Sequence, residues 1–323
     1  MADTNELSLT VTIKDLLDAG LHFGHQSKRW NPKMKRFIFD KRNGIYIIDL
    51  DKTLAQLKEA QQFIYDTVAG GRQVLFIGTK KACQEPLKEV ATRCGQHYVI
   101  SRWLGGTLTN HRNIGSSIRR MREIEALDQE GKLASMPQKE ASRLRHELSR
   151  LQRNLSGIAN MGNMPGAMVA VDINREAIAV REAIRMHIPV VAIVDTNCDP
   201  DLAQYPIPGN DDAIRGIKLI INILADAISE ASAEYAVAAA KIKEAREAAD
   251  KVKAAQADAQ PRSRRDRKPR RGDERPREKA SPAPAPAPVP APAVAAPAVA
   301  ATTAPAKPAE PSAAAAPKPD ASA

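Results

Sequence analysis

Two histidines are the first groups in the chain that could bind a metal ion. His22 and His25 stand in the sequence HFGH, and this spacing can direct two imidazole nitrogens toward one zinc ion. No cysteine, glutamate or third histidine stands nearby to complete a set of ligands. We therefore predict no metal site, and interpret the pair as histidines hydrogen-bonded in a structured loop, or with one of them facing a phosphate.

The segment FIGTK, from Phe76 to Lys80, is a candidate phosphate-binding loop. Its Gly-Thr-Lys sequence follows an apolar run, as the phosphate loop of a Rossmann fold does. Neither glycine fingerprint, G-x-G-x-x-G or G-x-x-x-x-G-K-[ST], accompanies it. We favour a structural interpretation, in which Gly78 permits a tight turn and Thr79 caps the next helix.

Acidic residues gather in two places in the second half of the chain. Asp195, Asp199 and Asp201 follow an apolar run, at the edge of a sheet where α/β proteins bind ligands. Asp211 and Asp212 precede a helix, where carboxylates suit the N-cap and the helix dipole. Magnesium-assisted catalysis would need a base or nucleophile beside these acids, and the sequence pairs none with them. We predict loop capping, and no catalytic residue, metal or cofactor.

The segment from Lys28 to Arg42 combines basic and aromatic residues as an RNA-binding segment does. Seven of its residues are basic and one is acidic, and Trp30, Phe37 and Phe39 stand among them. Cations can pair with phosphates, while flat rings stack on bases. The alternative is a solvated basic loop whose aromatic residues belong to the core.

The sequence RWLGGT, from Arg102 to Thr107, is a second candidate for recognition. Its glycines would let the backbone approach a ligand closely, while Arg102 and Trp103 would supply a charge and a flat ring. The alternative is that Trp103 belongs to the core. The residues that we predict to bind RNA are Lys28, Arg29, Trp30, Lys33, Lys35, Arg36, Arg102, Asn110, His111 and Arg112.

The elements that position these residues follow an α/β pattern. Four apolar runs alternate with amphipathic helices, which is typical of a parallel sheet covered on both faces. The runs are 74–77, 97–100, 168–171 and 190–194. Other predicted elements are a helix over 13–19 that begins at a Thr12–Asp15 capping box, strands over 36–39 and 45–48, and helices over 51–68, 175–187 and 213–229.

About 65 residues without a strand interrupt this alternation. Two stripes of apolar residues run through them, and the residues of the second stripe have the heptad spacing of a coiled coil. Because the connection around 131–137 is short, we predict an antiparallel helical hairpin inserted into the α/β domain, with arginines on its exposed faces. The stripes are Ile114, Ile118, Met121, Ile124 and Leu127, and then Leu144, Leu148, Leu151, Leu155 and Ile158.

The composition excludes several classes of protein. The chain has 323 residues and a formal net charge of +10, and it contains no apolar run long enough to span a membrane. The first ten residues lack the basic and apolar regions of a secretory signal. Three scattered cysteines do not indicate a disulfide framework or a zinc site. These features favour a cytoplasmic protein.

The C-terminal part differs in composition from the rest. Residues 231–257 are rich in alanine and predict a helical extension with few anchors. Residues 260–279 carry ten basic and four acidic residues, and the last 43 residues contain 19 Ala and 12 Pro, so both are expected to be disordered. The predicted organisation is an α/β domain (1–109 and 160–230), an inserted hairpin (110–159), a helical extension (231–257) and a disordered tail (258–323).

Five motifs resemble one known family. LHFGHQSKRWNPKMKRFIF, FIGTKK, RWLGGTLTN, AIVDTNCDPD and PIPGNDDAIR occur in order between about residues 8 and 230. They are similar to segments of the bacterial small-subunit ribosomal protein family numbered two, uS2. The resemblance implies a five-stranded parallel, flavodoxin-like sheet in a three-layer α/β/α fold with an inserted coiled-coil hairpin.

The same resemblance implies a structural role and no enzymatic activity. It implies binding to small-subunit rRNA where the head meets the body, and contacts with neighbouring ribosomal proteins, including the large flexible one that captures mRNA. It implies no membrane partner and no small-molecule substrate. The tail departs from the family pattern, so the resemblance implies nothing about its role.

Overall fold

The computed structural model describes the backbone of residues 11–259, and the side chains of that range except those of 242 and 245–259. The predicted basic and Ala/Pro-rich tail lies outside these residues from position 260 onward. Within the described range, no helix is both long and apolar enough to cross a bilayer.

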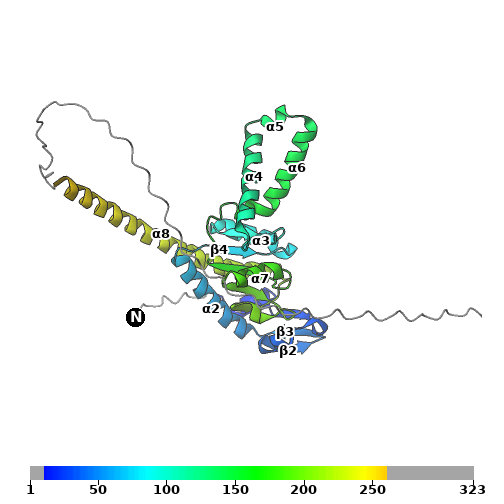
Figure 1. Cartoon of the computed structure of the whole chain (residues 1–323). Helices are drawn as coiled ribbons and strands as arrows, with labels where there is room; N and C mark the ends of the chain where they lie inside the picture. Colours follow the sequence, from blue (N-terminus) through cyan, green and yellow to red (C-terminus); the bar gives the residue numbers. More distant parts are fainter. Residues whose placement is uncertain (1–10, 260–323) are drawn as a thin grey trace, which may run out of the picture. The chain divides into compact units, whose positions relative to one another are not determined.

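A five-stranded parallel sheet forms the centre of the fold (Figure 1). The strand order is β5-β4-β6-β7-β8, and register pairs such as Ile77 with Ala170 define the parallel alignment. The strands are β4 (Val74–Ile77), β5 (His97–Val99), β6 (Ala167–Val171), β7 (Val190–Val194) and β8 (Tyr205–Pro208). The predicted α/β class is confirmed, and each of the four predicted apolar runs is a strand of this sheet.

β8 is the strand that the apolar pattern did not reveal. Its sequence YPIP contains two prolines, which lack an N–H and are therefore excluded from a strand that pairs on both sides. β8 lies at the edge of the sheet and pairs with β7 alone, so the prolines are accommodated there. The five-stranded sheet that the resemblance implied is confirmed.

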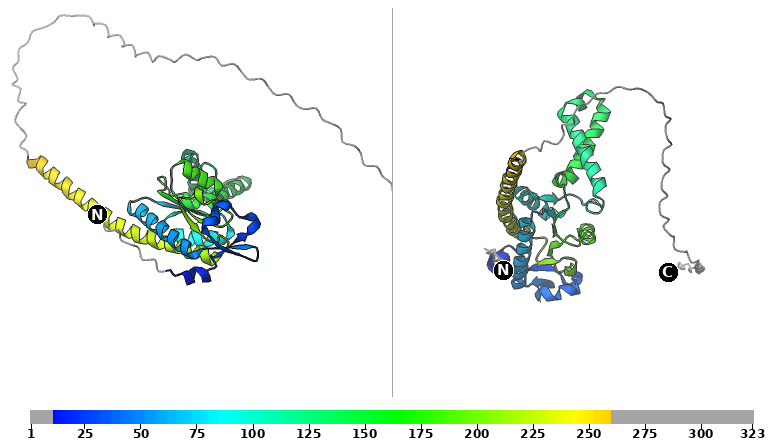
Figure 2. Two further views of the ribbon diagram at one scale, coloured as in Figure 1. Left: turned by 90° about the horizontal axis from the view of Figure 1, so that it is seen from below. Right: turned by 60° about the vertical axis from the view of Figure 1, so that its left-hand side comes forward.

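Three helices cover one face of the sheet. α2 (Leu50–Ala69), α3 (Lys81–Arg93) and α8 (Ile214–Ala259) pack together over a buried core that includes Val74 and Phe76. Figure 2 shows α2 and the first part of α8 side by side. The predicted separate elements over 213–229 and 231–257 form one continuous helix, because no proline or glycine interrupts the alanine-rich sequence between them.

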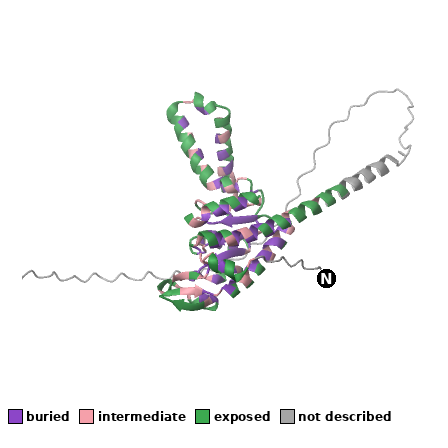
Figure 3. Cartoon of the chain, turned by 180° about the vertical axis from the view of Figure 1, so that it is seen from behind, coloured by how far each residue is buried: buried purple, intermediate pink, exposed green. Residues whose placement is uncertain are grey.

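The second face is covered by α7 and by segments from elsewhere in the chain. α7 (Ala177–Arg185) is shorter than the predicted helix over 175–187. Leu75 and Ile77 of β4 point to this face, where they join a second buried core with Met34 and Trp103. The fold therefore has three layers, and Figure 3 shows the buried strands between the partly exposed helices.

A second, three-stranded antiparallel sheet lies near the N-terminus. Its order is β1 (Phe23–Gln26), β3 (Ile45–Ile48) and β2 (Ile38–Arg42). The predicted strand over 36–39 was wrong in its first half, because Pro32 starts a 3-10 helix, η2, that runs to Phe37. Pro32 suits that position because its φ is fixed in the helical range and its missing N–H would be unpaired there.

The starts of two helices test the predicted caps. At α1 (Ile13–Asp18) the capping box is confirmed, since the Asp15 carboxylate accepts a 2.8 Å hydrogen bond from the Thr12 N–H and the Thr12 hydroxyl accepts one from the Asp15 N–H. The predicted cap of α2 at Asp51 was wrong. Asp49 is the N-cap, and its carboxylate accepts a hydrogen bond from the Asp51 N–H.

The segment without strands is helical. α4 (His111–Gln129) leads to the short α5 (Lys132–Ser135), and α6 (Gln138–Leu155) returns along α4 (Figure 1). Ile118 and Ile124 of α4 and Leu148 and Leu155 of α6 are buried in the second core. The apolar stripes of both helices thus lie on the sides that pack, which agrees with the predicted helical pair.

Candidate nucleic-acid interface

The basic segment is anchored by its apolar residues and exposes its cations. Met34 and Phe37 are buried in the second core, whereas the side chain of Phe39 is 76% exposed. Trp30 is half-buried and contacts Tyr46 of β3, with ring centroids 5.1 Å apart. The Lys41 Nζ lies 5.9 Å from the centroid of the Tyr46 ring. This arrangement leaves a partly exposed aromatic pair among cations.

Two of the predicted RNA-binding cations are engaged by acids of the same chain. The Lys33 Nζ lies 2.7 Å from Asp199 and 3.0 Å from Asp201, and Arg36 is 2.9 Å from Asp201. Hydrogen bonds to these carboxylates raise the pKa of Lys33, and the bond from Lys33 lowers that of Asp201. These pairs hold η2 against η4 (Pro200–Leu202), the loop after β7.

The other predicted cations of this segment have no such partners. Lys28, Arg29 and Lys35 are exposed, and none forms an ion pair within the described part of the chain. The charge available to an external phosphate therefore lies on these three residues and on the neighbouring Lys41 and Arg42, which are also exposed.

His25 is bound into the loop after β7. The Nδ1 of its ring lies 2.9 Å from an Asp195 oxygen, and its backbone N–H donates to the Thr196 hydroxyl at 2.8 Å. The hydrogen bond to Asp195 raises the pKa of His25. Gly24 is required here, because a Cβ would lie 2.5 Å from the Thr196 methyl carbon. The predicted hydrogen bonding of His25 is confirmed, but its predicted place in a loop was wrong, because His25 lies in strand β1. The buried Nδ1 of His22 has no hydrogen-bond partner in the described structure.

The predicted capping role of Asp211 and Asp212 was wrong. α8 begins at Ile214, and both carboxylates instead contact the Lys80 ammonium, at 2.8 Å and 2.5 Å. Asp211 is fully buried, and burial raises its pKa to about 6. Its second oxygen has no hydrogen-bond partner among the described residues.

Lys80 therefore neutralises acids of its own chain and is not presented to a nucleotide phosphate. Ligand atoms of His25, Asp195 and Asp211 lie within 4.8 Å of one another, close enough to hold a metal ion together. These residues come from β1 and from the loops after β7 and β8, and sequence spacing alone did not bring them together.

The FIGTK segment is explained by packing against α3. A Cβ on Gly78 would lie 2.6 Å from the Cys83 sulfur, so the glycine allows a close approach of strand and helix. The predicted cap at Thr79 was wrong, because its hydroxyl donates to the buried Glu176 at 2.5 Å, and Lys80 is the N-cap position of α3. Burial raises the pKa of Glu176.

The RWLGGT loop encloses a carboxylate of α7. One oxygen of Glu182 accepts hydrogen bonds from the Trp103 indole at 3.1 Å and the Gly106 N–H at 2.7 Å. The other accepts from the Leu108 N–H at 3.0 Å and from the N–H and hydroxyl of Thr109 at 3.3 Å. Burial opposes ionisation of Glu182, but these hydrogen bonds outweigh it and lower the pKa.

This geometry decides between the two interpretations of the loop. Trp103 is buried in the core, and Gly106, at a φ of 89°, brings its N–H to Glu182. The group that Gly106 approaches is therefore internal. Glu182 was not among the predicted residues, although its place among Ala179, Val180 and Ala183 on the apolar side of a helix was a signal for a buried, paired acid.

The remaining predicted residues stand at the two ends of this loop. Arg102 is exposed and lines a cavity of about 320 Å³ with Arg175 and Thr79. Asn110 and Arg112 are exposed at the start of α4, and His111 is half-buried. Glu182 organises the backbone between them and so determines where Arg102 and Arg112 are presented.

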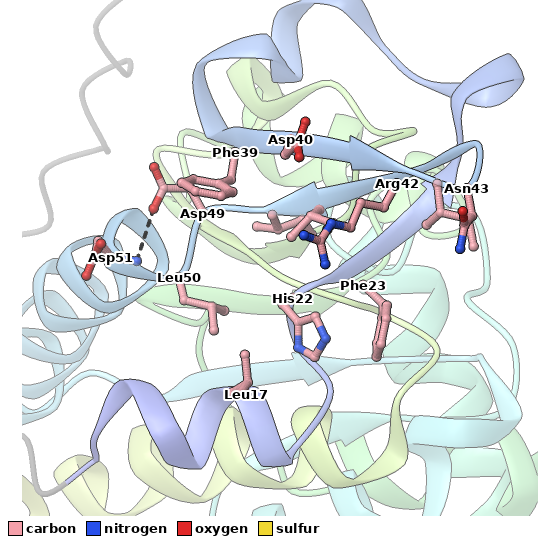
Figure 4. Close-up of a pocket in the computed structure, with 13 residues that line it drawn as sticks. Leu17, His22, Phe23, Phe39, Asp40, Arg42, Asn43, Asp49, Leu50 and Asp51 are labelled. Atoms are coloured by element: carbon pink, nitrogen blue, oxygen red, sulfur yellow. Dashed lines mark hydrogen bonds between the residues drawn. The ribbon is translucent and has the colours of Figure 1, made fainter.

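An apolar groove lies beside the antiparallel sheet (Figure 4). It has a volume of about 700 Å³, and its lining includes Leu17, Phe23, Phe39 and Ile45, all at least 37% exposed. Asp40, Asp49 and Asp51 stand at its polar edge, as does Arg42. Exposed apolar side chains gathered at one groove are typical of a surface that binds another protein.

Comparison with known proteins identifies the family. A family model described as ribosomal protein S2 matches residues 16–231, which include both sheets and the segment α4–α6. The chain is similar to the small ribosomal subunit protein uS2 of Syntrophobacter fumaroxidans, with 54% identity over 220 residues, which are 68% of this chain and 80% of the relative.

Two further relatives carry the same name. The protein of Koribacter versatilis is 51% identical over 222 residues, which are 69% of this chain and 74% of the relative. That of Mycobacteroides abscessus is 53% identical over 220 residues, which are 68% of this chain and 79% of the relative. With a family match over most of its length, and with relatives above half identity, this chain belongs to the structural, non-enzymatic ribosomal protein S2 family.

Proposed function

We propose that this protein binds small-subunit rRNA and neighbouring ribosomal proteins as a structural component of the cytoplasmic ribosome. The observation that carries the proposal is the unequal use of charge in the segment from Lys28 to Arg42. Lys33 and Arg36 are paired with Asp199 and Asp201, whereas Lys28, Arg29 and Lys35 are exposed without an ion pair in the described structure. The pairs fix the segment, and the free cations are available to phosphates.

The Trp30–Tyr46 pair supports the same assignment. Trp30 is half-buried and packs on Tyr46, so one part of its surface is held while another remains accessible. A fixed ring beside cations can stack on an exposed base or on a ribose while the cations contact the backbone. Arg102, Asn110, His111 and Arg112 form a second proposed contact, positioned by Glu182.

The apolar groove supports the protein-binding part of the proposal. The side chains of Leu17, Phe23 and Phe39 are exposed to water, and transfer of their apolar surface from water to a protein partner would be favourable. We propose that the groove receives an apolar segment of a neighbouring ribosomal protein, the large mRNA-capturing one that the resemblance implies. We also propose that the chain is organised as an α/β domain, an inserted coiled-coil hairpin and a C-terminal extension.

Charge-reversal variants test the RNA contact. Lys28, Arg29 and Lys35 changed together to Glu should weaken incorporation into small subunits lacking this protein, in competition with the unchanged chain. Lys58, Lys81 and Lys88, exposed on α2 and α3, changed to Glu give a matched control with the same change of net charge. Equal incorporation of the two variants would refute the assignment of this segment to RNA.

A further inference from the structure

A cavity of about 320 Å³ lies at the carboxyl edge of the parallel sheet, among the loops that follow β4, β5 and β6. Its lining includes Thr79 after β4, Arg102 after β5, and Arg175, Glu176 and Ile178 after β6. The cavity is separate from the apolar groove beside the antiparallel sheet, because the two share no lining residue. The proposed function uses only Arg102 among these residues, so it assigns no role to the cavity itself.

The cavity lies where the strand order of the sheet reverses. The chain passes from β4 to β5 on one side of β4, whereas β6 pairs with the other side. α3, which follows β4, packs on one face of the sheet, and α7, which follows β6, packs on the opposite face. The loops after β4 and β6 therefore diverge and leave a crevice between them. In open α/β sheets, this reversal point at the carboxyl ends of the strands is the place where ligands bind.

Two arginines, Arg102 and Arg175, bring hydrogen-bond donors to the cavity. The Arg175 Nε donates to the Thr79 hydroxyl at 3.0 Å, which holds this side chain at the cavity. Neither arginine forms an ion pair with any residue in the part of the chain that the structure describes. A guanidinium group carries five N–H donors, so most of these donors remain for an external anion. α7 begins at Ala177, and the positive end of its dipole adds to the positive potential there.

A buried carboxylate lines the same cavity and is only partly used by the protein. Glu176 is 3% exposed, and its Oε1 accepts hydrogen bonds from the Thr79 N–H at 2.8 Å and from the Thr79 hydroxyl at 2.5 Å. Its second oxygen accepts no hydrogen bond from the described residues. Buried polar atoms without a partner are uncommon in folded proteins. This oxygen is therefore available to a hydrogen-bond donor of a ligand in the cavity.

We propose that this cavity binds a free ribonucleoside 5′-monophosphate, with its phosphate on Arg102 and Arg175 and a ribose hydroxyl donating to Glu176. Guanidinium groups hold phosphate oxygens in pairs, and a carboxylate at this edge of an α/β sheet is suited to accept from a ribose hydroxyl. Ile178, which is 55% exposed, offers apolar surface to the base.

The size and charge of the cavity favour a mononucleotide over larger or simpler anions. A volume of about 320 Å³ is at the small end of the range for ligand pockets, so it suits one nucleotide better than a dinucleotide. A terminal phosphate carries nearly two negative charges, which match two guanidinium groups, whereas each phosphate of an RNA backbone carries one. Inorganic phosphate has the charge but would leave the apolar surface of Ile178 uncovered.

The test measures binding of the four labelled ribonucleoside 5′-monophosphates to the full chain, purified free of RNA, by equilibrium dialysis. We expect at least one of them to bind, and Arg175→Gln to raise its Kd about tenfold or more, because a charge-assisted hydrogen bond to phosphate is lost. The matched control is Arg181→Gln, which makes the same change of charge at an exposed position of α7 outside the cavity. Its Kd should stay within about twofold of that of the unchanged chain. Thermal melting of each variant shows that it is folded.

Comparison ligands test the two halves of the contact. The 2′,3′-dideoxy analogue of the bound nucleotide lacks both ribose hydroxyls and should bind several-fold more weakly; equal affinity would overturn the contact with Glu176. Inorganic phosphate that binds as tightly as the nucleotide would overturn the nucleotide in favour of a simple anion. The absence of binding by all four nucleotides at millimolar concentration, or an equal effect of Arg175→Gln and Arg181→Gln, would overturn the site. None of these results bears on entry of the chain into small subunits, which tests the proposed function separately.

Discussion

Replacement of Glu182 tests whether one buried carboxylate organises the loop from Trp103 to Thr109. Glu182→Ala removes the acceptor for the Trp103 indole, for three backbone N–H groups and for the Thr109 hydroxyl. A buried donor left without an acceptor costs about 1–3 kcal/mol. The Trp103 and Leu108 donors are in the buried part of the loop, whereas the others can recover hydrogen bonds from water.

Two buried donors left without an acceptor give an expected loss of about 2–6 kcal/mol in the free energy of unfolding for Glu182→Ala. Glu182→Gln retains the shape but brings an NH₂ group against N–H donors, so we expect an intermediate loss. Denaturant unfolding of the full chain measures both, with Glu59→Gln on the exposed side of α2 as the control. Hydrogen exchange should show the largest change in residues 103–109.

The pH dependence provides an independent check of the same site. The pKa of Glu182 is lowered in the folded protein, so its contribution to stability is present above the pKa of an unfolded glutamate, about 4.3. It is lost as the pH falls through the lower, folded value. The unchanged protein should therefore lose more stability on acidification than Glu182→Gln does. Equal acid sensitivity of the two proteins, or a loss no larger than that of Glu59→Gln, would refute the reasoning.

Three further predictions concern other parts of the chain. Leu148→Ala should cost about 2–4 kcal/mol, seen in segment-resolved hydrogen exchange as opening of α4 and α6 while β4 and β7 stay protected; uniform loss of protection would contradict this. Gly78→Ala should cost about 1–3 kcal/mol through contact with Cys83, and Cys83→Ala should relieve part of that cost in a double-mutant cycle; additive losses would exclude the contact. Deletion of 260–323, which removes the basic segment, should flatten the salt dependence of RNA binding, whereas deletion of 281–323 alone should not; a loss from the shorter deletion would show a partner for the Ala/Pro region.

The sheet could be predicted because its signal is local. Runs such as Val74–Ile77 and Val190–Val194 are apolar throughout, as strands buried on both faces must be. β8 lacked that signal because prolines at an edge strand look like a loop. The strand predicted over 36–39 failed because Pro32 favours a helical turn that consumes the first residues of the expected strand.

The site was less predictable because its partners are distant in the sequence. Lys33 pairs with Asp199, which lies 166 positions away in the sequence. The segment from Lys28 to Arg42 therefore has fewer unpaired cations than its sequence indicated. Lys80 donates a hydrogen bond to Asp211, which lies 131 positions away in the sequence. The rules for helix caps consider only neighbouring residues and so could not predict this contact. The predicted close backbone approach in RWLGGT is found at Gly106, but the group approached is Glu182 of the same chain.

Co-sedimentation with small subunits that lack this protein tests the central claim most directly. The full chain is mixed with such subunits and sedimented over a range of KCl concentrations, together with the variant in which Lys28, Arg29 and Lys35 are Glu. We expect the full chain to sediment with the subunits at low salt and to dissociate as the salt concentration rises, and we expect the variant to dissociate at a lower salt concentration. Failure of the full chain to sediment with them, or identical salt profiles for the two proteins, would contradict this expectation.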